Sequence, residues 1–518
     1  MFLSESVYYS QNVGINTDGS SPTTGAIFHV KSTNAVLFDN GTLGSGTPLS
    51  LGAGTKFLWY PRKASIRAGQ ISNTEWDDAN IGNHSAAFGQ NNIASGSHSI
   101  AAGDDNRVSG NYSSVIGFEN VNEGDYAFVS GYQNVFSTGT ATNGHYTAVF
   151  GRGNEYAAYD LIQGFQNTSD NSYVTINGQL NDVGASFATV FGSSNTIGSQ
   201  FAFASGQAHS IQGTYSTAFG LTNSLSANHT FASGQENTLS SVYSFANGSN
   251  NNVGGGGYNA TFGTANTISG SAAYSFVSGA LNTVSGTSSA ALGLFNTVSG
   301  TSSFAAGETV NVSAHQSIGL GRYITVDDLH SVIIGTGTGV ASANHLVVNN
   351  DNTFGVGFDH TSPTLEVYCQ LSGTYGKVGL ARTPLTNRLE VNGNASKSSA
   401  GSWLANSDGR LKKDITPIHS KNVLSRIIQL QGVTYYWNDT VTSWSADRPP
   451  EIQYGFIAQD FQKEFPDLVS EDAEGYLQMG HGTLDPLFVE AFKAQQEQIE
   501  ELKIEIEKLK NILREKTD

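Results

Sequence analysis

Apolar and polar positions alternate in a pattern that repeats about every fourteen residues between Ser85 and Gly335. Each unit places small or aromatic residues just before a glycine, an asparagine usually three residues after it, and an aliphatic residue two positions further on. This period is too short for two helices and a turn, but it fits two strands of four or five residues and two tight turns. The pattern therefore predicts a β-solenoid with one coil per unit. The marker glycines are Gly89, Gly103, Gly117, Gly131, Gly151, Gly164, Gly178, Gly192, Gly206, Gly220, Gly234, Gly248, Gly263, Gly279, Gly293, Gly307, Gly321 and Gly335.

The glycines and asparagines of the repeat have expected structural roles. Glycine supplies a positive φ or lets two backbones approach closely, and asparagine tolerates the left-handed region. Asparagines at equal positions of successive coils would also form hydrogen-bonded ladders. We therefore interpret these asparagines as structural residues and not as ligands.

The period breaks between Gly131 and Gly151, in a stretch that includes residues 136–146, and again at the four glycines 254–257. Because the side faces of a uniform coil repeat the same small polar residues, we expect specific binding at these breaks or in the amino-terminal region. Insertions without any binding role are the alternative interpretation.

The segments that flank the repeat predict other structures. Residues 1–80 contain short apolar runs between turn signals, which predicts a small β-rich region. Pairs of short β segments are expected again at 341–400. The last thirty residues predict a helix with apolar residues at alternating spacings of three and four, which is typical of a short coiled coil. This seam consists of Phe488, Phe492, Ile499, Leu502, Ile506, Leu509 and Leu513, with Gln495 as an interruption.

Composition supports a fibre. The chain has 518 residues, 60 glycines and 13% charged residues, and its formal net charge is −18. Such a charge argues against nucleic acid or an anionic membrane as a partner. A single coil also buries little apolar surface per ordered residue, so we expect several copies to associate.

The amino terminus lacks a basic segment followed by an apolar one, and no run of about twenty apolar residues occurs. We therefore expect neither a secretion signal nor a membrane anchor. Cys369 is the only cysteine, which excludes an intrachain disulfide, and we interpret it as a small buried apolar residue. No cofactor or metal site is expected.

The repeated phrase, for example residues 303–307 with the sequence Ser-Phe-Ala-Ala-Gly, resembles the left-handed β-roll heads of trimeric autotransporter adhesins and related fibres. That resemblance implies three parallel rolls packed side by side. The Val-Gly-Ile, proline and Leu-Asp-Val order of fibre-shaft connectors is also similar to residues 13–30, 355–367 and 378–391. Ile and Leu in the helical seam would alone favour a dimer, but we expect a trimer because so short a seam specifies the oligomeric state weakly.

The sequence pattern changes near residue 400. Four motifs follow in order, at residues 407–415, 433–437, 454–459 and 465–469, and a fifth at 484–493. They resemble the intramolecular chaperone domain at the carboxy end of phage endosialidases and many tail fibres. The resemblance implies a domain that trimerises and folds the fibre and then cuts itself off. Ser407 would be the nucleophile, Lys412 the base, and the break would lie between Asn406 and Ser407.

A serine hydroxyl is a poor nucleophile unless a base accepts its proton, and lysine can be that base only where burial keeps it neutral. Some members of the family carry an accessory histidine before the Gly-x-Ile-Ala-Gln motif. Gln453 and Tyr454 stand there in this chain, so no accessory histidine is expected at this position. His419 and His481 are interpreted as surface or packing residues.

The sequence thus predicts a mainly β fold with a trimeric left-handed β-roll solenoid and β connectors, followed by a small α+β chaperone domain ending in a coiled-coil helix. The expected domains are residues 1–80, 81–340, 341–400, 401–490 and 491–518. The leading hypothesis is a homotrimeric phage tail fibre or similar virion appendage that binds an unknown host-surface receptor and cleaves itself once.

Two other functions compete with this hypothesis. The first is a bacterial surface adhesin with the same roll. The second is a glycan-degrading tailspike, which would need paired carboxylates in a groove. The acidic pairs Asp104-Asp105 and Asp327-Asp328 are adjacent in sequence and would face opposite ways in a strand, so we interpret them as solvated turns.

Overall fold

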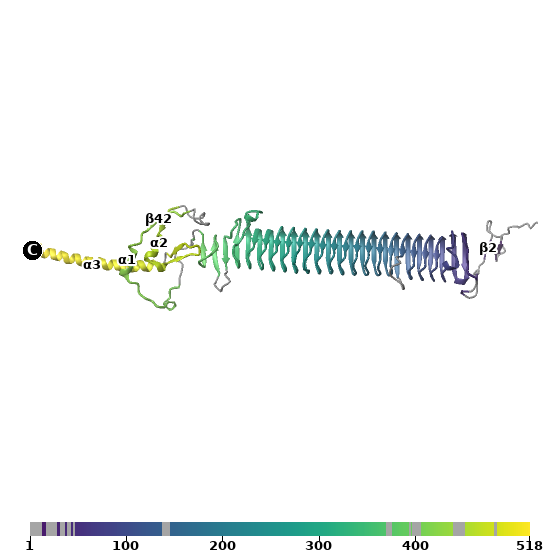
Figure 1. The fold of residues 1–518 in the computed structure, drawn as a ribbon, viewed down its shortest axis with the longest axis horizontal. Helices are drawn as coiled ribbons and strands as arrows, with labels where there is room; N and C mark the ends of the chain where they lie inside the picture. The colour runs from purple at the N-terminus through teal and green to yellow at the C-terminus, as the bar shows by residue number, and fades with distance from the viewer. Residues whose placement is uncertain are drawn as a thin grey trace, which may run out of the picture. The chain divides into compact units, whose positions relative to one another are not determined.

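The computed structural model describes residues 13–16, 28–31, 37–38, 43–44, 47–136, 146–368, 376–392, 395, 406–438, 451–480 and 484–517. Cys369, His481 and residues 137–145, in the middle of the stretch between Gly131 and Gly151, lie outside the described residues. The chain divides into two compact units, Met1–Gly234 and Gln235–Asp518. Coils of a β-solenoid, about 21 turns altogether, make up most of the first unit and the amino-terminal part of the second, so the predicted mainly β fold is confirmed (Figure 1).

Each coil of the first unit contains one long and one short strand, and both pair in parallel with the same strands of the next coil. Gly89 pairs with Gly103, and Ile93 pairs with Arg107. The long strands are β5 (Ala86–Gln90), β7 (Ile100–Asp104), β9 (Ser114–Phe118), β11 (Ala127–Tyr132), β13 (Thr147–Arg152), β15 (Leu161–Phe165), β17 (Thr175–Gln179), β19 (Thr189–Ser193), β21 (Phe203–Gln207) and β23 (Thr217–Leu221). The short strands are β6 (Ile93–Ala94), β8 (Arg107–Val108), β10 (Val121–Asn122), β12 (Val135–Phe136), β14 (Glu155–Tyr156), β16 (Thr168–Ser169), β18 (Asp182–Val183), β20 (Thr196–Ile197), β22 (Ser210–Ile211) and β24 (Ser224–Leu225). The long strand β25 (Phe231–Gln235) lies where the units meet in sequence.

The second unit contains coils of the same kind. Its long strands are β27 (Phe245–Ser249), β29 (Ala260–Thr264), β31 (Phe276–Ala280), β33 (Ala290–Leu294), β35 (Phe304–Val312), β36 (Ile318–Val326) and β37 (Val332–Thr336). Its short strands are β26 (Thr238–Leu239), β28 (Asn252–Val253), β30 (Thr267–Ile268), β32 (Thr283–Val284) and β34 (Thr297–Val298). In β35 and β36 long and short strand merge, because Val310 and Ile324 stand where the repeat otherwise has asparagine.

The interior of each coil is narrow and filled by two rows of side chains. One row comes from the long strands, for example Ala101 and Val115, and the other from the short strands, for example Val108 and Ile197. All four are at most 1% exposed. These alternate inward residues are the small and aliphatic positions of the repeat, as expected for strands with one buried face.

The predicted asparagine ladder is present. The Asn106 side chain donates from Nδ2 to Oδ1 of Asn92 at 3.0 Å and to the carbonyl of Gly117 at 2.7 Å. The Asn106 backbone N–H also donates to Oδ1 of Asn92, at 3.0 Å. Because a side-chain oxygen takes this N–H in place of a strand carbonyl, the coil turns here and the short strand is only two residues long. The prediction of four or five residues was therefore wrong for the short strand.

The left-handed positions of the coil are not the ladder asparagines, which corrects our expectation. Two other residues per coil have positive φ, for example Asp105 at +53° and Tyr112 at +55°. The marker glycines behave as expected. Gly103 has φ of +119°, and a Cβ there would lie 1.9 Å from the carbonyl oxygen of Gly117.

A hairpin covers the first coil. Strand β3 (Gly54–Tyr60) runs antiparallel to β4 (Ser65–Ile71), and β4 pairs in parallel with β5. Around it Tyr60, Ile71, Trp76 and Ile81 form a small core. The remaining described elements nearby are β1 (Val13–Asn16), which pairs in parallel with β2 (Phe28–Lys31), and the short 3-10 helices η1 (Pro61–Lys63) and η2 (Asp78–Asn80).

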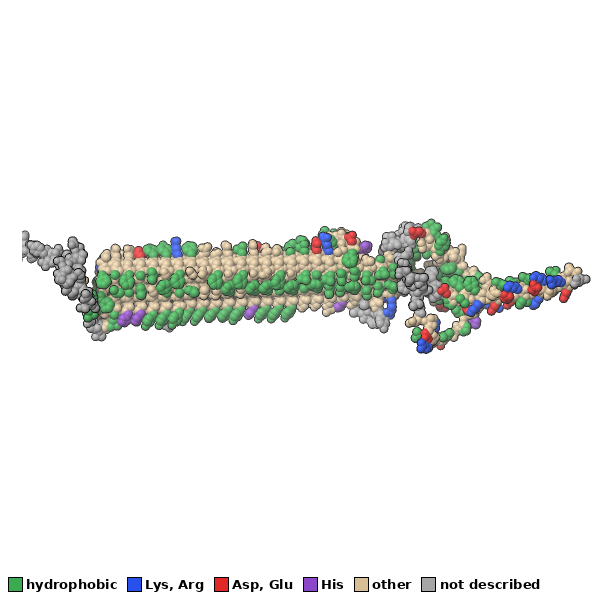
Figure 2. All heavy atoms as spheres, turned by 180° about the vertical axis from the view of Figure 1, so that it is seen from behind, with side chains coloured by type: hydrophobic (Ala, Val, Ile, Leu, Met, Phe, Trp, Pro, Cys, Tyr) green, Lys and Arg blue, Asp and Glu red, His purple; other side chains and the backbone are tan. Residues whose placement is uncertain are grey.

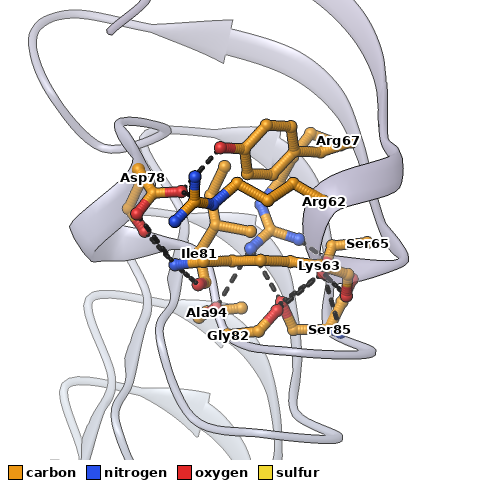
Figure 3. Close-up of polar contacts among 10 residues, drawn as sticks. Arg62, Lys63, Ser65, Arg67, Asp78, Ile81, Gly82, Ser85 and Ala94 are labelled. Atoms are coloured by element: carbon orange, nitrogen blue, oxygen red, sulfur yellow. Dashed lines mark hydrogen bonds and ion pairs between the residues drawn. The ribbon is translucent and has the colours of Figure 1, made fainter. Parts of the chain in front are cut away.

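Arg67 occupies the inward position of this first coil, where later coils have alanine or an aliphatic residue (Figure 3). It is fully buried and has no carboxylate partner among the described contacts; its guanidinium donates to the carbonyls of Ile66, Ser85 and Ala94 at 2.9–3.0 Å and to the Ser85 hydroxyl at 2.9 Å. Burial lowers the pKa of Arg67 to about 10. The side chain thus closes the end of the solenoid interior with buried hydrogen bonds to coil carbonyls.

After the last coils come η3 (Ser342–Asn344) and four connector strands, β38 (Thr353–Gly357), β39 (Leu365–Tyr368), β40 (Lys377–Leu380) and β41 (Leu389–Val391). The pairs β38–β39 and β39–β40 are antiparallel, whereas β40–β41 is parallel, as β1–β2 is. The strands within the segment at residues 13–30 thus form a parallel pair, and so do the strands within the segment at residues 378–391.

The last part of the second unit is a small α+β region. It contains η4 (Gly409–Leu411), α1 (Ser420–Ile427), β42 (Val433–Tyr435), β43 (Gln453–Gly455), α2 (Ala458–Glu464), η6 (Pro466–Leu468), β44 (Val469–Glu471), β45 (Leu477–Met479) and α3 (Asp485–Thr517). The predicted carboxy-terminal helix is confirmed as α3. No helix in the described part of the chain is long and apolar enough to cross a membrane.

Candidate functional site

The predicted nucleophile and base lie together in the segment that precedes α1. The Lys412 ammonium donates from Nζ to Oγ of Ser407 at 2.6 Å. Between them the chain forms the 3-10 turn η4, closed by bonds from Leu411 N–H to the Asp408 carbonyl and from Lys412 N–H to the Gly409 carbonyl. This turn brings residues five apart in sequence into contact. The catalytic roles themselves stay predictions.

Asp408 caps this turn. Its Oδ1 accepts the backbone N–H of Arg410 at 2.9 Å, and the Arg410 guanidinium binds both carboxylate oxygens, with Nη2 2.7 Å from Oδ2. The Arg410 side chain lowers the pKa of the Asp408 carboxyl, and Asp408 in turn raises the pKa of Arg410. Sequence analysis did not single out this pair, although an aspartate directly before a Gly-x-Leu turn is a typical cap.

The site is open in a single chain. Residues 406–419 are all exposed, including the Ser407 and Lys412 side chains. Leu411 and Ile415 are 69% and 71% exposed, so two apolar side chains of this segment have nothing to pack against. An open site of this kind lacks the burial that would favour a neutral lysine.

The other chaperone-like motifs form one core beside this segment. Phe461, Phe465 and Leu484 are buried, and Phe456, Leu468 and Phe488 pack against them. Strands β42 and β43 are antiparallel, and helix α1 packs on α3. The Ser420 hydroxyl donates to Glu490 at 2.6 Å and ties these helices together. Motifs that are far apart in sequence are thus the parts of one small domain.

No histidine stands at the accessory position on β43, as the sequence indicated. Gln453 and Tyr454 lie on β43, and the Tyr454 ring is 81% exposed. His419 is exposed at the start of α1. A groove of about 420 Å³ lies between β42 and α2 and is lined by Tyr435, Trp437 and Gln459 among others. The sequence contains a run of aromatic residues at 435–437, but the groove that these residues line was not predicted.

A second candidate lies in the first unit, beside the longest break of the period. Aromatic rings at one corner of the coils stack on one another, with centroids 4.7 Å apart for His98 and Tyr112, and form a row along the surface (Figure 2). Between Tyr146 and Tyr159 the distance rises to 6.1 Å and the rings tilt by 41°. A shallow hollow of about 520 Å³ lies here. The row consists of His84, His98, Tyr112, Tyr126, Tyr146, Tyr159, Tyr173, Phe187, Phe201, Tyr215 and His229.

Asp160 lines this hollow, but its carboxylate is bound to the backbone of the coil. Its two carboxylate oxygens accept the backbone N–H groups of Ala157 at 2.9 Å and Val174 at 3.0 Å. Burial raises its pKa to about 7. The other predicted break, residues 254–257, contains Gly255 and Gly257 with φ of +89° and +109°, and Gly257 forms a bridge with Ala273.

The acidic pairs do not form a catalytic groove. Asp104 ends strand β7 and Asp105 occupies a left-handed turn position, while Asp327 and Asp328 lie in the turn after β36. Burial, and then Asp105 and Glu119, raise the pKa of Asp104. Both pairs lie at coil turns.

Comparisons with known proteins bear on the carboxy-terminal domain. No curated protein matches the chain. A family model described as the chaperone of endosialidase matches residues 407–470, which begin at the predicted nucleophile. This family is associated with self-cleaving chaperone activity. The chain is therefore a fibre-like β-solenoid protein that carries a domain similar to the chaperone of endosialidase.

Proposed function

We propose that this protein is one subunit of a homotrimeric fibre whose carboxy-terminal domain assists assembly and then releases itself by cleavage between Asn406 and Ser407. The observation that carries the proposal is the 2.6 Å contact between Lys412 Nζ and Ser407 Oγ at the start of the segment that the chaperone family matches. The resemblance to the chaperone family points to Ser407 and Lys412, and the contact between the two side chains is consistent with the proposed roles.

The outer face of the long strands supports association of several copies. In the first unit this face carries large apolar side chains that are 37–49% exposed. They are Phe88, Ile100, Ile116, Phe128, Phe150, Leu161, Phe191 and Phe219. On the cap hairpin Phe57 and Trp59 pair with Ala68 and Ile66 and extend the same face. Bands of hydrophobic side chains run along the coils in Figure 2.

The outward residues of the short strands are mostly polar, for example Arg107, Thr168 and Thr196. Because one face of the coil is apolar and the other polar, association through the long-strand face would bury apolar surface and leave the polar face in water. In the second unit Phe262 and Phe276 continue the apolar character of the long strands.

The cleavage proceeds in two steps. The Ser407 hydroxyl attacks the carbonyl carbon of Asn406 while Lys412 takes the hydroxyl proton. The peptide C–N bond then breaks, the proton passes to the nitrogen of Ser407, and an ester joins the Asn406 carbonyl to Oγ. Water hydrolyses this ester and leaves a carboxylate at Asn406 and a new amino terminus at Ser407.

Assembly is expected to precede cleavage. Lys412 must lose its proton before it can act as a base, and burial favours the neutral amine. Both side chains are exposed in the single chain, as are Leu411 and Ile415. A neighbouring copy that covers this segment would bury the apolar side chains and the amine together, so cleavage would report a completed trimer.

Deletion of residues 407–518 tests the assembly role. The shaft alone is expected to be insoluble or monomeric, whereas the full-length Ser407→Ala variant, which keeps the domain but lacks the nucleophile, is expected to be soluble and trimeric. Sedimentation of both proteins after identical expression measures this. Soluble trimers of the truncated shaft would exclude the assembly role.

We further propose that the fibre belongs to a virion and binds a host-surface receptor at the break beside Tyr146. The hollow with its tilted rings is the observation that favours this place over the regular coils. Removal of residues 137–145 should lower adsorption to host cells without loss of the trimer. Unchanged adsorption would contradict this location, and absence of the protein from purified virions would contradict the localisation.

A further inference from the structure

The geometry of the Ser407 segment depends on a residue that neither catalyses nor forms part of the core. Five fully extended residues span about 17 Å, which is farther than a lysine side chain can reach back. The 2.6 Å contact between Lys412 and Ser407 therefore requires the chain between them to turn. Residues 409–411 form that turn.

The turn has little support other than Asp408. Residues 406–419 are exposed, so no packing against the domain core fixes its shape. Two backbone bonds close it, at 3.0 Å from Leu411 N–H to the Asp408 carbonyl and at 3.2 Å from Lys412 N–H to the Gly409 carbonyl. The Asp408 side chain adds the cap, since its Oδ1 accepts the Arg410 N–H that the turn leaves unpaired.

Arg410 fixes the capping carboxylate in place. Its Nε lies 3.1 Å from Oδ1 and 3.2 Å from Oδ2, and its Nη2 lies 2.7 Å from Oδ2. This forked arrangement restricts the orientation of the carboxylate more than a single contact would. It also places a positive charge against the carboxylate.

We propose that Asp408 is a positioning residue for the self-cleavage, which holds Lys412 against Ser407 by capping the turn at residues 409–411. This inference rests on the proposed cleavage. It differs from a catalytic role because Asp408 contacts neither the scissile carbonyl nor the hydroxyl in the described structure. The short side-chain oxygen that caps the turn is the required feature, and the pair with Arg410 only restrains the orientation of that oxygen.

The test compares Asp408→Asn with Asp408→Gln in the full chain. Both variants remove the charge, but asparagine is a good cap and glutamine, one methylene longer, is not. The rate of conversion of trimeric full-length chain to fragments is measured on gels. We expect Asp408→Asn to cleave within about threefold of the wild-type rate, and Asp408→Gln and Asp408→Ala to be slower by about tenfold, the size of a lost cap.

Asp414→Asn is the matched control, because it removes one acidic charge from the same exposed segment outside the cap. It should cleave at the wild-type rate, and all variants should remain trimeric by sedimentation, since the cap lies outside the core. Restored cleavage in Asp408→Asn distinguishes positioning from a general loss of fold, which would affect both substitutions alike.

Each outcome decides the question. Equal rates for Asp408→Asn and Asp408→Gln in intact trimers would overturn the positioning role, even if both are slow, because charge would then be the property that matters. Cleavage of Asp408→Ala at the wild-type rate would overturn it as well. If the wild-type trimer does not cleave at all, the proposed function fails, and this result is distinct from either of the others.

Discussion

Single residues at the corners of the coil determine whether successive turns can stack. Each ladder asparagine bonds to the next and to the backbone: Nδ2 of Asn195 donates to Oδ1 of Asn181 at 2.8 Å and to the Gly206 carbonyl at 3.2 Å, and the same Oδ1 accepts the Asn195 backbone N–H at 3.1 Å. A buried backbone group without a partner costs about 1–3 kcal/mol. Repetition of this bond pattern along the coil therefore makes the asparagine position structural.

Two glycines of the same coil should respond oppositely to a methyl group. At Gly178 φ is +151° and a Cβ would lie 1.7 Å from the Gly192 carbonyl oxygen, whereas at Gly184 the nearest atom would be 3.9 Å away. Gly178→Ala should destabilise the shaft by about 2 kcal/mol or more, because the strained backbone and the clash add. Gly184→Ala should be neutral or slightly stabilising. Thermal unfolding measures both, and equal melting temperatures would contradict the assigned register.

His209 should make the shaft sensitive to mild acid. It replaces an asparagine in the ladder, where its Nδ1 accepts the Asn223 N–H at 3.2 Å while Nε2 lies 3.2 Å from the Ser205 carbonyl. Burial lowers its pKa, so the unfolded chain binds a proton before the folded one does. Stability is then lost as the pH falls from the ordinary histidine value of about 6.5 toward the lower folded value.

His209→Asn restores the ladder and should remove this loss. The melting temperature of both proteins is compared at each pH between 8 and 5. The comparison is made pairwise because Asp160, with its pKa raised to about 7, acts in the opposite direction and loses stability as the pH rises. Parallel curves for the two proteins would show that His209 contributes nothing.

At the scale of elements, the coil was predictable because its signal repeats. Gly103, Asn106 and Val108 each recur in step, so the register, the ladder and the inward row all followed from spacing. The two-residue short strand did not follow, since its length depends on a side-chain oxygen replacing a strand carbonyl. Tyr112 in a left-handed turn was also missed, because aromatic residues favour strands and only stacking between coils compensates here.

Some parts of the candidate sites were likewise predicted from the sequence and others were not. Ser407 and Lys412 were predicted because the surrounding motifs resemble the chaperone domain, and the two side chains are in contact in the structure. The cap by Asp408 was not found, because one aspartate before a glycine is common in any chain. The hollow beside Tyr146 was located only as an irregularity of the period, and its tilted rings required coordinates.

Helix α3 offers a direct test of the predicted seam. Leu502 lies in the seam and Ile504 lies on the other side of the helix, and both are 57% exposed in a single chain. Leu502→Asp should place a charge in the buried interface and reduce the trimer fraction, whereas Ile504→Asp should leave it unchanged. Light scattering during size-exclusion chromatography gives the mass of each. An equal effect of both substitutions would mean that the seam is not where copies meet.

At the scale of the whole molecule, both the shaft and the chaperone-like domain expose surfaces in a single chain. The shaft exposes the apolar face of its long strands, and the domain exposes the Ser407–Lys412 contact. In the proposed assembly, other copies would cover the long-strand face of the shaft and would bury the Ser407–Lys412 contact, which favours the neutral amine. Cleavage after assembly would then remove the domain that guided folding and leave a shaft whose persistence is kinetic.

Intact-mass spectrometry of freshly assembled wild-type protein tests this account most directly. Two species whose masses sum to that of the chain plus one water, one of them beginning at Ser407, are expected. Ser407→Ala, Lys412→Ala and Lys412→Arg should each remain whole, the last because a guanidinium cannot act as a base. A single wild-type species of 54.7 kDa that persists for days after assembly would contradict self-cleavage, however well the two side chains are placed.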